Sequence, residues 1–327
     1  THDGVSFNFV ADKPTLLSRI SRLEANTSVP GRLIAMVRSL KPDVVHVHGF
    51  HHPRAIQSLG QVLGDAPILV QDHATRAPRG WRAGIWRALC RRLAGVIFTS
   101  RDQAQPFVDA GVFSRDLPIF EVLESSVHFS PGDQQSARRD TGLGGDPCFL
   151  WTGHLNENKD PLTTLAAFAR VVSQLSNARL WCCFGTAPLM KQVTKYIDSH
   201  PGLADRVTFL GDRPHSEMEQ LFRAADFFVQ TSHRESTGYS LIEALACGTP
   251  ALVTDIPASR RITANGRVSS LTPVGDAHAL ATAMVAWAQR NRLESRRAAR
   301  SWFEESLSFE CIGRELRAAY ESVARAT

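Results

Sequence analysis

Apolar positions along the chain alternate between two patterns. Short runs rich in β-branched and aromatic residues are separated by longer stretches in which apolar residues recur every three or four positions. The first pattern is typical of buried strands and the second of amphipathic helices, so their alternation predicts βαβ units and parallel sheets. We expect strands over residues 44–47, 67–70, 96–99, 148–152, 179–184, 206–210, 226–231 and 251–254, and helices over 30–40, 161–175, 190–200, 216–225, 241–247, 277–290 and 309–324.

A cluster of glycine, proline and aspartate residues interrupts this pattern after residue 130. Such residues break helices and strands, so they mark a domain boundary. We therefore predict an N-terminal domain over residues 1–130, a linker over 131–147 and a C-terminal domain over 148–305. Residues 306–327 carry apolar side chains at helical spacing, which predicts a C-terminal helix that packs back on the protein.

The composition excludes several classes of protein. Of the 327 residues, 43% are hydrophobic and 21% charged, which excludes a disordered or collagen-like chain. No apolar run reaches the roughly 18 residues of a membrane-spanning helix. A net charge of +5 gives no indication of nucleic-acid binding. The six cysteines form no CxxC pair, so we expect buried, reduced thiols in a cytoplasmic protein.

A polar loop follows the expected strand at 148–152, where open parallel sheets bind ligands. It reads Gly-His-Leu-Asn-Glu-Asn-Lys-Asp over residues 153–160. Asp160 can cap a helix that opens at Pro161, because proline is favoured at the first helical position. Lys159 would then lie beside a helix N-terminus, and both groups suit a phosphate. A solvated surface lysine is the alternative.

A second polar loop follows the expected strand at 226–231. Gly238 permits a close backbone approach just before the helix at 241–247, whose free amides suit an anionic group. Ser240 and Glu243 also match the capping box S-x-x-E, which offers a purely structural interpretation of Glu243. Glu235 lies outside the helix, and the alternative interpretation is that it is an ordinary surface carboxylate.

Glu235 and Glu243 do not fit the catalytic pair of a glycosidase. Eight positions at helical rise span about 12 Å, whereas glycosidase carboxylates lie about 5–9.5 Å apart. Two carboxylates that bind different hydroxyl groups of one long ligand fit this spacing better.

Four segments of the chain belong together as a set. They are the loop at 153–161, Arg-Val-Thr-Phe-Leu-Gly at 206–211, the Glu-x7-Glu segment at 235–243, and Ala-Cys-Gly-Thr-Pro at 246–250. With this set, the chain from about residue 44 to its end resembles the family 4 retaining glycosyltransferases. The resemblance implies an α/β protein of GT-B fold, with two Rossmann-like parallel-sheet domains facing a cleft.

The resemblance also implies an activity and the residues that carry it. The protein would be a hexosyltransferase that moves a hexosyl group from a nucleotide sugar, most commonly a UDP-sugar, to an acceptor hydroxyl with retention. Glu235 would bind donor-sugar hydroxyls, Lys159 would neutralise the diphosphate, and His73 would face the transferred sugar. Glu243 would bind the ribose. The other donor-binding positions that it implies are Gly153, His154, Phe209, Leu210, Thr237, Gly238, Tyr239 and Ser240.

Such enzymes are thought to need no metal ion, because the departing phosphate can take the acceptor proton. We therefore expect no metal and no cofactor besides the donor substrate. Four histidines, His46, His48, His51 and His52, are dense in the first segment, and strand-end positions are favoured for them over a zinc site. The expected partners are the nucleotide sugar and a glycan, lipid-linked or small-molecule acceptor.

The chain departs from the family pattern at three places. His154 stands where the family has arginine, which is a permanent bidentate phosphate ligand, whereas histidine is neutral near pH 7. Ser236 stands where relatives often have glycine. Little chain precedes the strand at 44–47, so we expect the first strand and its Gly-rich loop to be lacking. A catalytically impaired nucleotide-sugar-binding homologue and a GT-B nucleotide-sugar epimerase therefore stay open as alternatives.

The stretch from residue 73 to residue 101 carries seven arginines and no acidic residue. Ile85, Leu89 and Leu93 recur every four positions, with Trp81 and Trp86 nearby. A basic amphipathic helix of this kind can lie on an anionic membrane, so residues 76–93 are a candidate for peripheral contact at the inner face of the membrane. The alternative is a helix packed on its own sheet with an arginine-rich solvent face.

Overall fold

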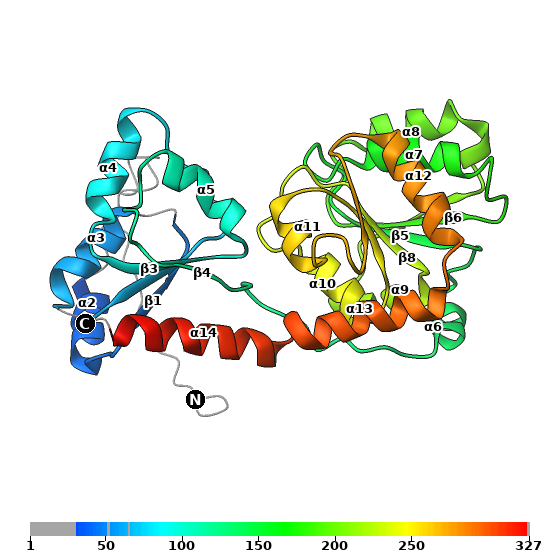
Figure 1. Ribbon diagram of the computed structural model, residues 1–327. Coiled ribbons are helices and arrows are strands. Elements are labelled where there is room, and N and C mark those ends of the chain that lie inside the picture. Colours follow the sequence, from blue (N-terminus) through cyan, green and yellow to red (C-terminus); the bar gives the residue numbers. More distant parts are fainter. Residues whose placement is uncertain (1–30, 51–52, 65, 326–327) are drawn as a thin grey trace. The chain divides into compact units, whose positions relative to one another are not determined.

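The computed structural model describes residues 31–50, 53–64 and 66–325. It contains two compact units (Figure 1). Unit 1 comprises the chain up to Val122 together with the segment from Glu315 onward, and unit 2 comprises Leu123–Arg314. The expectation about the first strand and Gly-rich loop concerns positions before residue 31 and lies outside the described residues.

Unit 1 is built on a four-stranded parallel sheet of order β1-β2-β3-β4. Its core is aromatic, because Phe50, Phe98, Phe107 and Phe113 are buried and their rings are in mutual contact. The elements are α2 (Gly31–Leu40), β1 (Val45–His48), α3 (Pro53–Val62), β2 (Ile68–Gln71), α4 (Trp81–Leu89), β3 (Leu93–Phe98), α5 (Arg101–Asp109) and β4 (Ile119–Glu121).

Unit 2 is built on a six-stranded parallel sheet of order β10-β9-β8-β5-β6-β7. Its strands are β5 (Cys148–Gly153), β6 (Arg179–Phe184), β7 (Val207–Gly211), β8 (Phe227–Gln230), β9 (Ala251–Thr254) and β10 (Ser270–Thr272). Its helices are α6 (Gln134–Thr141), α7 (Pro161–Val171), α8 (Met190–Asp198), η1 (Pro201–Leu203), α9 (His215–Ala224), α10 (Tyr239–Ala246), α11 (Pro257–Ile262), α12 (Ala277–Ala288) and α13 (Arg292–Ser306), and α14 (Phe309–Ala324) begins in unit 2 and ends in unit 1.

Helices cover both faces of the sheet in unit 2, as expected for a doubly wound domain. α7, α8 and α12 pack together on one face, and α6, α9, α10 and α13 pack on the other (Figure 1). The central strands β5, β8 and β9 are therefore buried along nearly their whole length, with Phe149, Trp151 and Phe227 among the core residues. The predicted fold class of two parallel-sheet α/β domains is confirmed.

The predicted strands and helices are all present, with ends shifted by a few residues. Two strands were missed, β4 and β10, because each is only three residues long. The helices α3, α5, α6, α11 and α13 were also missed. The apolar pattern of the polar helix α13 is weak, since it buries only Ala299 and Phe303. Its arginines hold it in place instead, because Arg296 and Arg300 donate to main-chain carbonyl groups of the unit.

The segment predicted as a linker, 131–147, is part of unit 2 rather than a connection, and the units divide at Val122 instead of at residue 130. It contains α6, which packs on α9. Asp133 caps α6 by accepting from the Ser136 amide, and Gly142 ends it in the left-handed conformation. The breakers that suggested a boundary are therefore the caps of a short helix.

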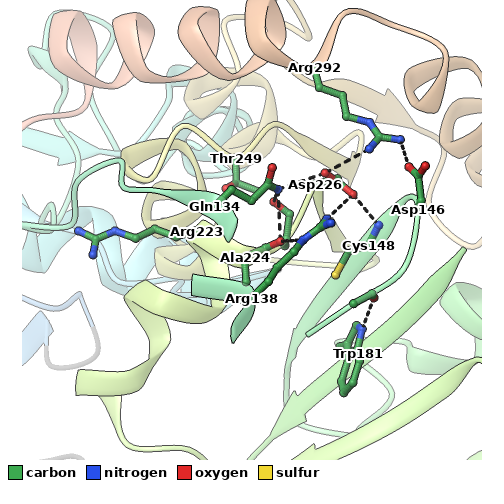
Figure 2. Close-up of polar contacts among 12 residues, drawn as sticks. Gln134, Arg138, Asp146, Cys148, Trp181, Arg223, Ala224, Asp226, Thr249 and Arg292 are labelled. Atoms are coloured by element: carbon green, nitrogen blue, oxygen red, sulfur yellow. Dashed lines mark hydrogen bonds and ion pairs between the residues drawn. The ribbon is translucent and has the colours of Figure 1, made fainter. Parts of the chain in front are cut away.

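A buried carboxylate anchors α6 to the sheet. Asp226, at the amino end of β8, accepts hydrogen bonds from the Cys148 amide (2.7 Å), the Arg138 guanidinium (2.8 Å) and the Gln134 amide (3.1 Å), while Arg292 lies 3.5 Å away (Figure 2). The aspartate side chain is 2% exposed. Removing one member of such a buried charged network leaves the others unpaired, so the network fixes α6 firmly.

The C-terminal helix α14 has the bounds that the sequence predicts, and its Tyr320 hydroxyl lies 2.7 Å from Nδ1 of His46 in unit 1. All six cysteines are buried and free, as the sequence predicts for reduced thiols. Within the described ranges, no helix is both long and apolar enough to cross a bilayer.

Candidate functional site

The strand order of unit 2 contains a topological switch point. β6 and β7 lie on one side of β5, whereas β8, β9 and β10 lie on the other, so the winding reverses between β5 and β8. Doubly wound sheets bind their ligands at this point, outside the carboxyl ends of the strands. The loop that follows β5 carries Lys159, and the loop that follows β8 carries Glu235.

The two loops meet through these side chains. Nζ of Lys159 lies 2.5 Å from Oε1 of Glu235, and the Gln230 amide donates to the same oxygen at 3.1 Å. Gly153 provides the room, since a Cβ at this position would lie 3.3 Å from Cγ of Lys159. The lysine and glutamate side chains are 23% and 13% exposed, so the pair stays within reach of a ligand.

Further polar contacts hold the loops together behind this pair. The Asn158 amide donates to the Arg234 carbonyl at 3.1 Å, and Nε2 of His233 lies 3.0 Å from Oδ2 of Asp160. Asp160 also caps α7 by accepting from the Thr163 amide, as the sequence predicts. No local pattern in the sequence pointed to Asn158 or His233, because their partners lie more than seventy positions away.

Helix α10 begins directly after the Glu235 loop. Gly238 is its N-cap in the left-handed conformation, with φ of 79°, and no side chain caps the helix. The capping-box interpretation of Ser240 and Glu243 is therefore wrong, because Ser240 lies inside the first turn. Thr237 is buried and Tyr239 is exposed. The first amides of α10 thus form a positive helix end beside Glu235.

Glu243 lies on α10, and its partner is His215 of α9. Nε2 of His215 lies 2.9 Å from Oε1 of Glu243, and the histidine ring stacks on Phe129 with centroids 5.1 Å apart. Burial raises the pKa of Glu243, and the hydrogen bond and charge of His215 oppose that shift. A cavity of about 630 Å³ has Glu243, His215, Phe129 and Tyr239 in its wall. Glu243 thus offers a carboxylate to this cavity.

Ser236 has a partner that the sequence did not reveal. Glu124 accepts hydrogen bonds from the Ser236 hydroxyl and from the Tyr239 hydroxyl, the latter at 3.3 Å. Burial, reinforced by the Glu124 charge, raises the pKa of Tyr239 to about 12. Ser236 therefore holds a second carboxylate next to Glu235.

His154 is held in one tautomer. The Thr186 backbone amide donates to its Nδ1 at 3.1 Å. Because a backbone amide can only donate, Nδ1 carries no proton, and Nε2 must be the protonated nitrogen. The ring therefore presents one neutral N–H donor while this bond is kept. An arginine at the same position would present a permanent charge and several donors.

Phe209 and Leu210 lie on the edge strand β7. The register with β6 shifts here, because Phe209 pairs with Cys182 whereas Gly211 pairs with Cys183, which leaves Leu210 as the extra residue. The Phe209 ring is 36% exposed and lies edge-on to Phe184. Both residues thus lie near the carboxyl end of β7. The switch-point loops follow the carboxyl ends of β5 and β8, so they leave the same end of the parallel sheet.

Several buried polar atoms near the switch point have no hydrogen-bond partner among the described residues. They are the hydroxyl oxygens of Thr152 and Ser232 and the amide oxygen of Gln230. All three residues lie at or just beyond the carboxyl end of β5 or β8. Buried polar atoms are normally paired, so their concentration marks this end of the sheet as suited to a polar ligand.

His73 lies in unit 1, two residues beyond β2, among other histidines. Its Nε2 is 3.2 Å from Nδ1 of His48, and the His48 ring also stacks on His46. Burial lowers the pKa of His46 to about 4, and the neighbouring histidines add to the shift. His46 is in turn bonded to Tyr320 of α14. The positions proposed with them, His51 and His52, lie outside the described residues.

The residues whose placement is described include no group of three or more His, Cys, Asp or Glu side chains arranged to hold a metal ion. Lys159 and the first turn of α10 are positive groups at the switch point.

Two family models match the chain, one in each unit. Residues 5–118 match the glycosyl transferase 4-like domain, and residues 146–290 match the glycosyl transferases group 1. Among curated proteins, the D-inositol 3-phosphate glycosyltransferase of Segniliparus rotundus is 33% identical over 225 residues, which is 64% of this chain and 45% of that protein. The enzyme of the same name from Nocardia farcinica is 25% identical over 217 residues, 64% of this chain and 46% of that protein. The chain spans less than half the length of both relatives.

Solved structures share the fold over most of the chain. The Anabaena protein HepE in complex with UDP gives a TM-score of 0.71 at 20% identity, covering 91% of this chain and 85% of that one. Sucrose-phosphate synthase from Thermosynechococcus elongatus gives 0.70 at 21% identity, covering 91% and 78%. Two matched family models, the relatives and the shared two-domain fold together show that this chain belongs to the family 4 type of glycosyltransferases with GT-B fold.

Proposed function

We propose that the protein is a retaining hexosyltransferase that takes a hexosyl group from a UDP-sugar and transfers it to an acceptor hydroxyl. The observation that carries this proposal is the contact between Lys159 and Glu235, which joins the two loops of the switch point. A cation and a carboxylate at this place match the two ends of a sugar diphosphate. The UDP and UDP-glucose complexes of the structural neighbour HepE support uridine as the nucleoside.

The donor would exchange the partners of this pair. Lys159 would turn from Glu235 to the diphosphate, and Glu235 would turn from Lys159 to the hydroxyl groups of the sugar. The uncapped first turn of α10, opened by Gly238, would donate its amides to the same phosphate oxygens. Lys159 and Glu235 each have a protein partner without the ligand, so neither charge is left unpaired when the site is empty.

The nucleoside would lie toward the cavity that Glu243 faces. A buried carboxylate that accepts from His215 can accept from ribose hydroxyls instead. Phe209 and Leu210, at the end of β7, would lie against the base through main-chain contacts. His154 would add one neutral donor to the phosphates through its Nε2.

Negative charge develops on the diphosphate as the bond between the anomeric carbon and the phosphate oxygen breaks. Lys159 and the α10 amides would stabilise that charge, which is preorganised electrostatic catalysis. The acceptor oxygen would form its bond on the same face of the sugar, and the departing phosphate would take the acceptor proton. His73 would face the transferred sugar. These groups supply the positive charge that the reaction requires, so we propose that no metal ion takes part.

A ligand panel tests this proposal on the full chain. We expect UDP and UDP-sugars to raise the melting temperature selectively over GDP and ADP, since ligand at about 100 times its Kd adds about 2.7 kcal/mol. Incubation of the UDP-sugar with candidate acceptors in EDTA should then give an α-linked product from an α-linked donor. A sugar that changes configuration without transfer would assign the chain to the epimerases. Binding without turnover would assign it to the impaired homologues.

A further inference from the structure

Helix α4 of unit 1 leaves an apolar face uncovered. Trp81 is 75% exposed and Ile85 is 45% exposed, and their spacing of four residues places them on one face. Gly84 and Ala88, on the same side, are also exposed. The opposite face is already packed, because Ala83 is buried and Trp86 stacks on Phe50. The exposed tryptophan and isoleucine are therefore not needed by the core of unit 1.

The surroundings of this face are strongly positive. Arg76, Arg79, Arg82 and Arg91 are exposed, and residues 73–101 contain no acidic residue. Arg87 and Arg92 donate to the carbonyl groups of Gly111 and Gly60. The partner in each of these contacts is a neutral carbonyl group rather than a carboxylate. An exposed apolar face bordered by arginines is the pattern of helices that lie in the interface of an anionic bilayer.

We propose that the outward face of α4 docks on an anionic lipid surface, with Trp81 and Ile85 in the interfacial layer and the neighbouring arginines on lipid headgroups. The charge pattern argues for lipid over a second copy of the chain, since pairing two copies of this face would bring arginine against arginine. A tryptophan at the border between apolar and charged groups also suits the membrane interface. The proposal is independent of the transferase chemistry.

Vesicle binding by the full chain tests the proposal. We expect at least tenfold stronger partitioning to vesicles of phosphatidylcholine with phosphatidylglycerol than to phosphatidylcholine alone, weakening as salt rises from 0.1 to 0.5 M. The double substitution W81S/I85S should lower that partitioning at least tenfold. Leu293→Ser is the matched control, because Leu293 is 59% exposed on α13 of unit 2 and its loss should leave partitioning unchanged.

Contact between Trp81 and lipid can also be measured directly. Brominated lipids should quench part of the tryptophan fluorescence of the unaltered protein, and Trp81→Phe should reduce that quenching while the protein still binds. Equal binding to neutral and anionic vesicles, or full binding by W81S/I85S, would overturn the proposal. A dimer in sedimentation analysis that W81S/I85S dissociates would assign the face to a second copy instead. Circular dichroism of each variant shows whether it is folded.

Discussion

The two ends of strand β8 carry carboxylates in opposite situations. At the amino end, Asp226 is 2% exposed and accepts from a backbone amide, a glutamine and an arginine, with Arg292 close by. Just beyond the carboxyl end, Glu235 is more exposed and bonds to Lys159 and Gln230. One carboxylate is enclosed by helices and strands, whereas the other lies on a loop at the switch point.

This difference separates a structural charge from a candidate functional one. The Asp226 partners come from α6, β5 and the start of α13, so a change of partner would require those elements to move. The Lys159–Glu235 pair joins two loops, so its members can exchange one another for a ligand with little movement of the sheet. Both carboxylates have cationic partners. The position of Glu235 outside the carboxyl end of a strand is therefore what marks it as a candidate ligand-binding group.

The largest effect is expected on stability, from a substitution of Asp226 at the amino end of β8. Asp226→Ala should lower the free energy of unfolding by about 3–5 kcal/mol, because Arg138 and the Cys148 amide lose their buried acceptor. Urea denaturation followed by circular dichroism measures this change. Asp140→Ala, at an exposed position of α6, is the control and should change stability by less than about 0.5 kcal/mol. Equal effects of both substitutions would contradict the structural role.

Beyond the carboxyl end of β8, removal of the Glu235 charge should leave the protein folded and stop the reaction. Glu235→Gln should lower turnover by about 100-fold or more, since the sugar hydroxyls lose a charged acceptor in the transition state. Its free energy of unfolding should fall by only about 1–2 kcal/mol. Glu217→Gln, at an exposed position of α9, is the matched control for activity. Wild-type turnover by E235Q would remove Glu235 from the proposed site.

The Glu243–His215 contact gives a prediction in pH. Burial raises the folded-state pKa of Glu243 above 4.5, so the native state binds more protons than the unfolded state in that range. The stability that Glu243 contributes is therefore full below pH 4.5 and is lost as pH rises through the raised pKa. Relative to Glu243→Gln, the unaltered protein should lose stability as pH rises above about 4.5, as thermal unfolding at a series of pH values would show. A constant difference across that range would contradict the shift.

The same substitution should weaken nucleotide binding by about tenfold at pH 7.5, a loss of about 1.4 kcal/mol, because an amide accepts more weakly than a carboxylate. Titration calorimetry with UDP measures it. His215→Ala separates the effect on the pKa from the effect on nucleotide binding. It removes the partner that opposes the pKa shift and leaves the Glu243 carboxylate in place. An unchanged UDP affinity in E243Q would place the ribose elsewhere.

The sequence predicted the parallel sheets and the loops that carry Lys159 and Glu235, because both follow from local pattern and from strand ends. It did not predict Gln230, His215 or Glu124 as partners in the site. The contacts of His215 and Glu124 join positions 28 and 115 apart, which no local spacing encodes. The Gln230 contact spans five positions, but it depends on how the loop after β8 turns back. The capping box at Ser240 failed for the opposite reason, since a matching local motif was displaced by a glycine that starts the helix earlier.

The smallest effect is expected at His154. Because the Thr186 amide fixes its ring as a neutral donor, His154→Arg adds a charge and further donors toward the phosphates, and UDP should bind about three- to tenfold more tightly. Asn177→Arg adds the same charge at an exposed position before β6, on the opposite edge of the sheet, and should leave the affinity unchanged. Calorimetry at 0.15 M salt limits long-range effects of the added charge. If both variants tighten binding equally, the gain is general electrostatics and His154 does not contact the phosphates. A gain confined to H154R would mean that the histidine holds a phosphate-binding position with less charge than the site can accommodate.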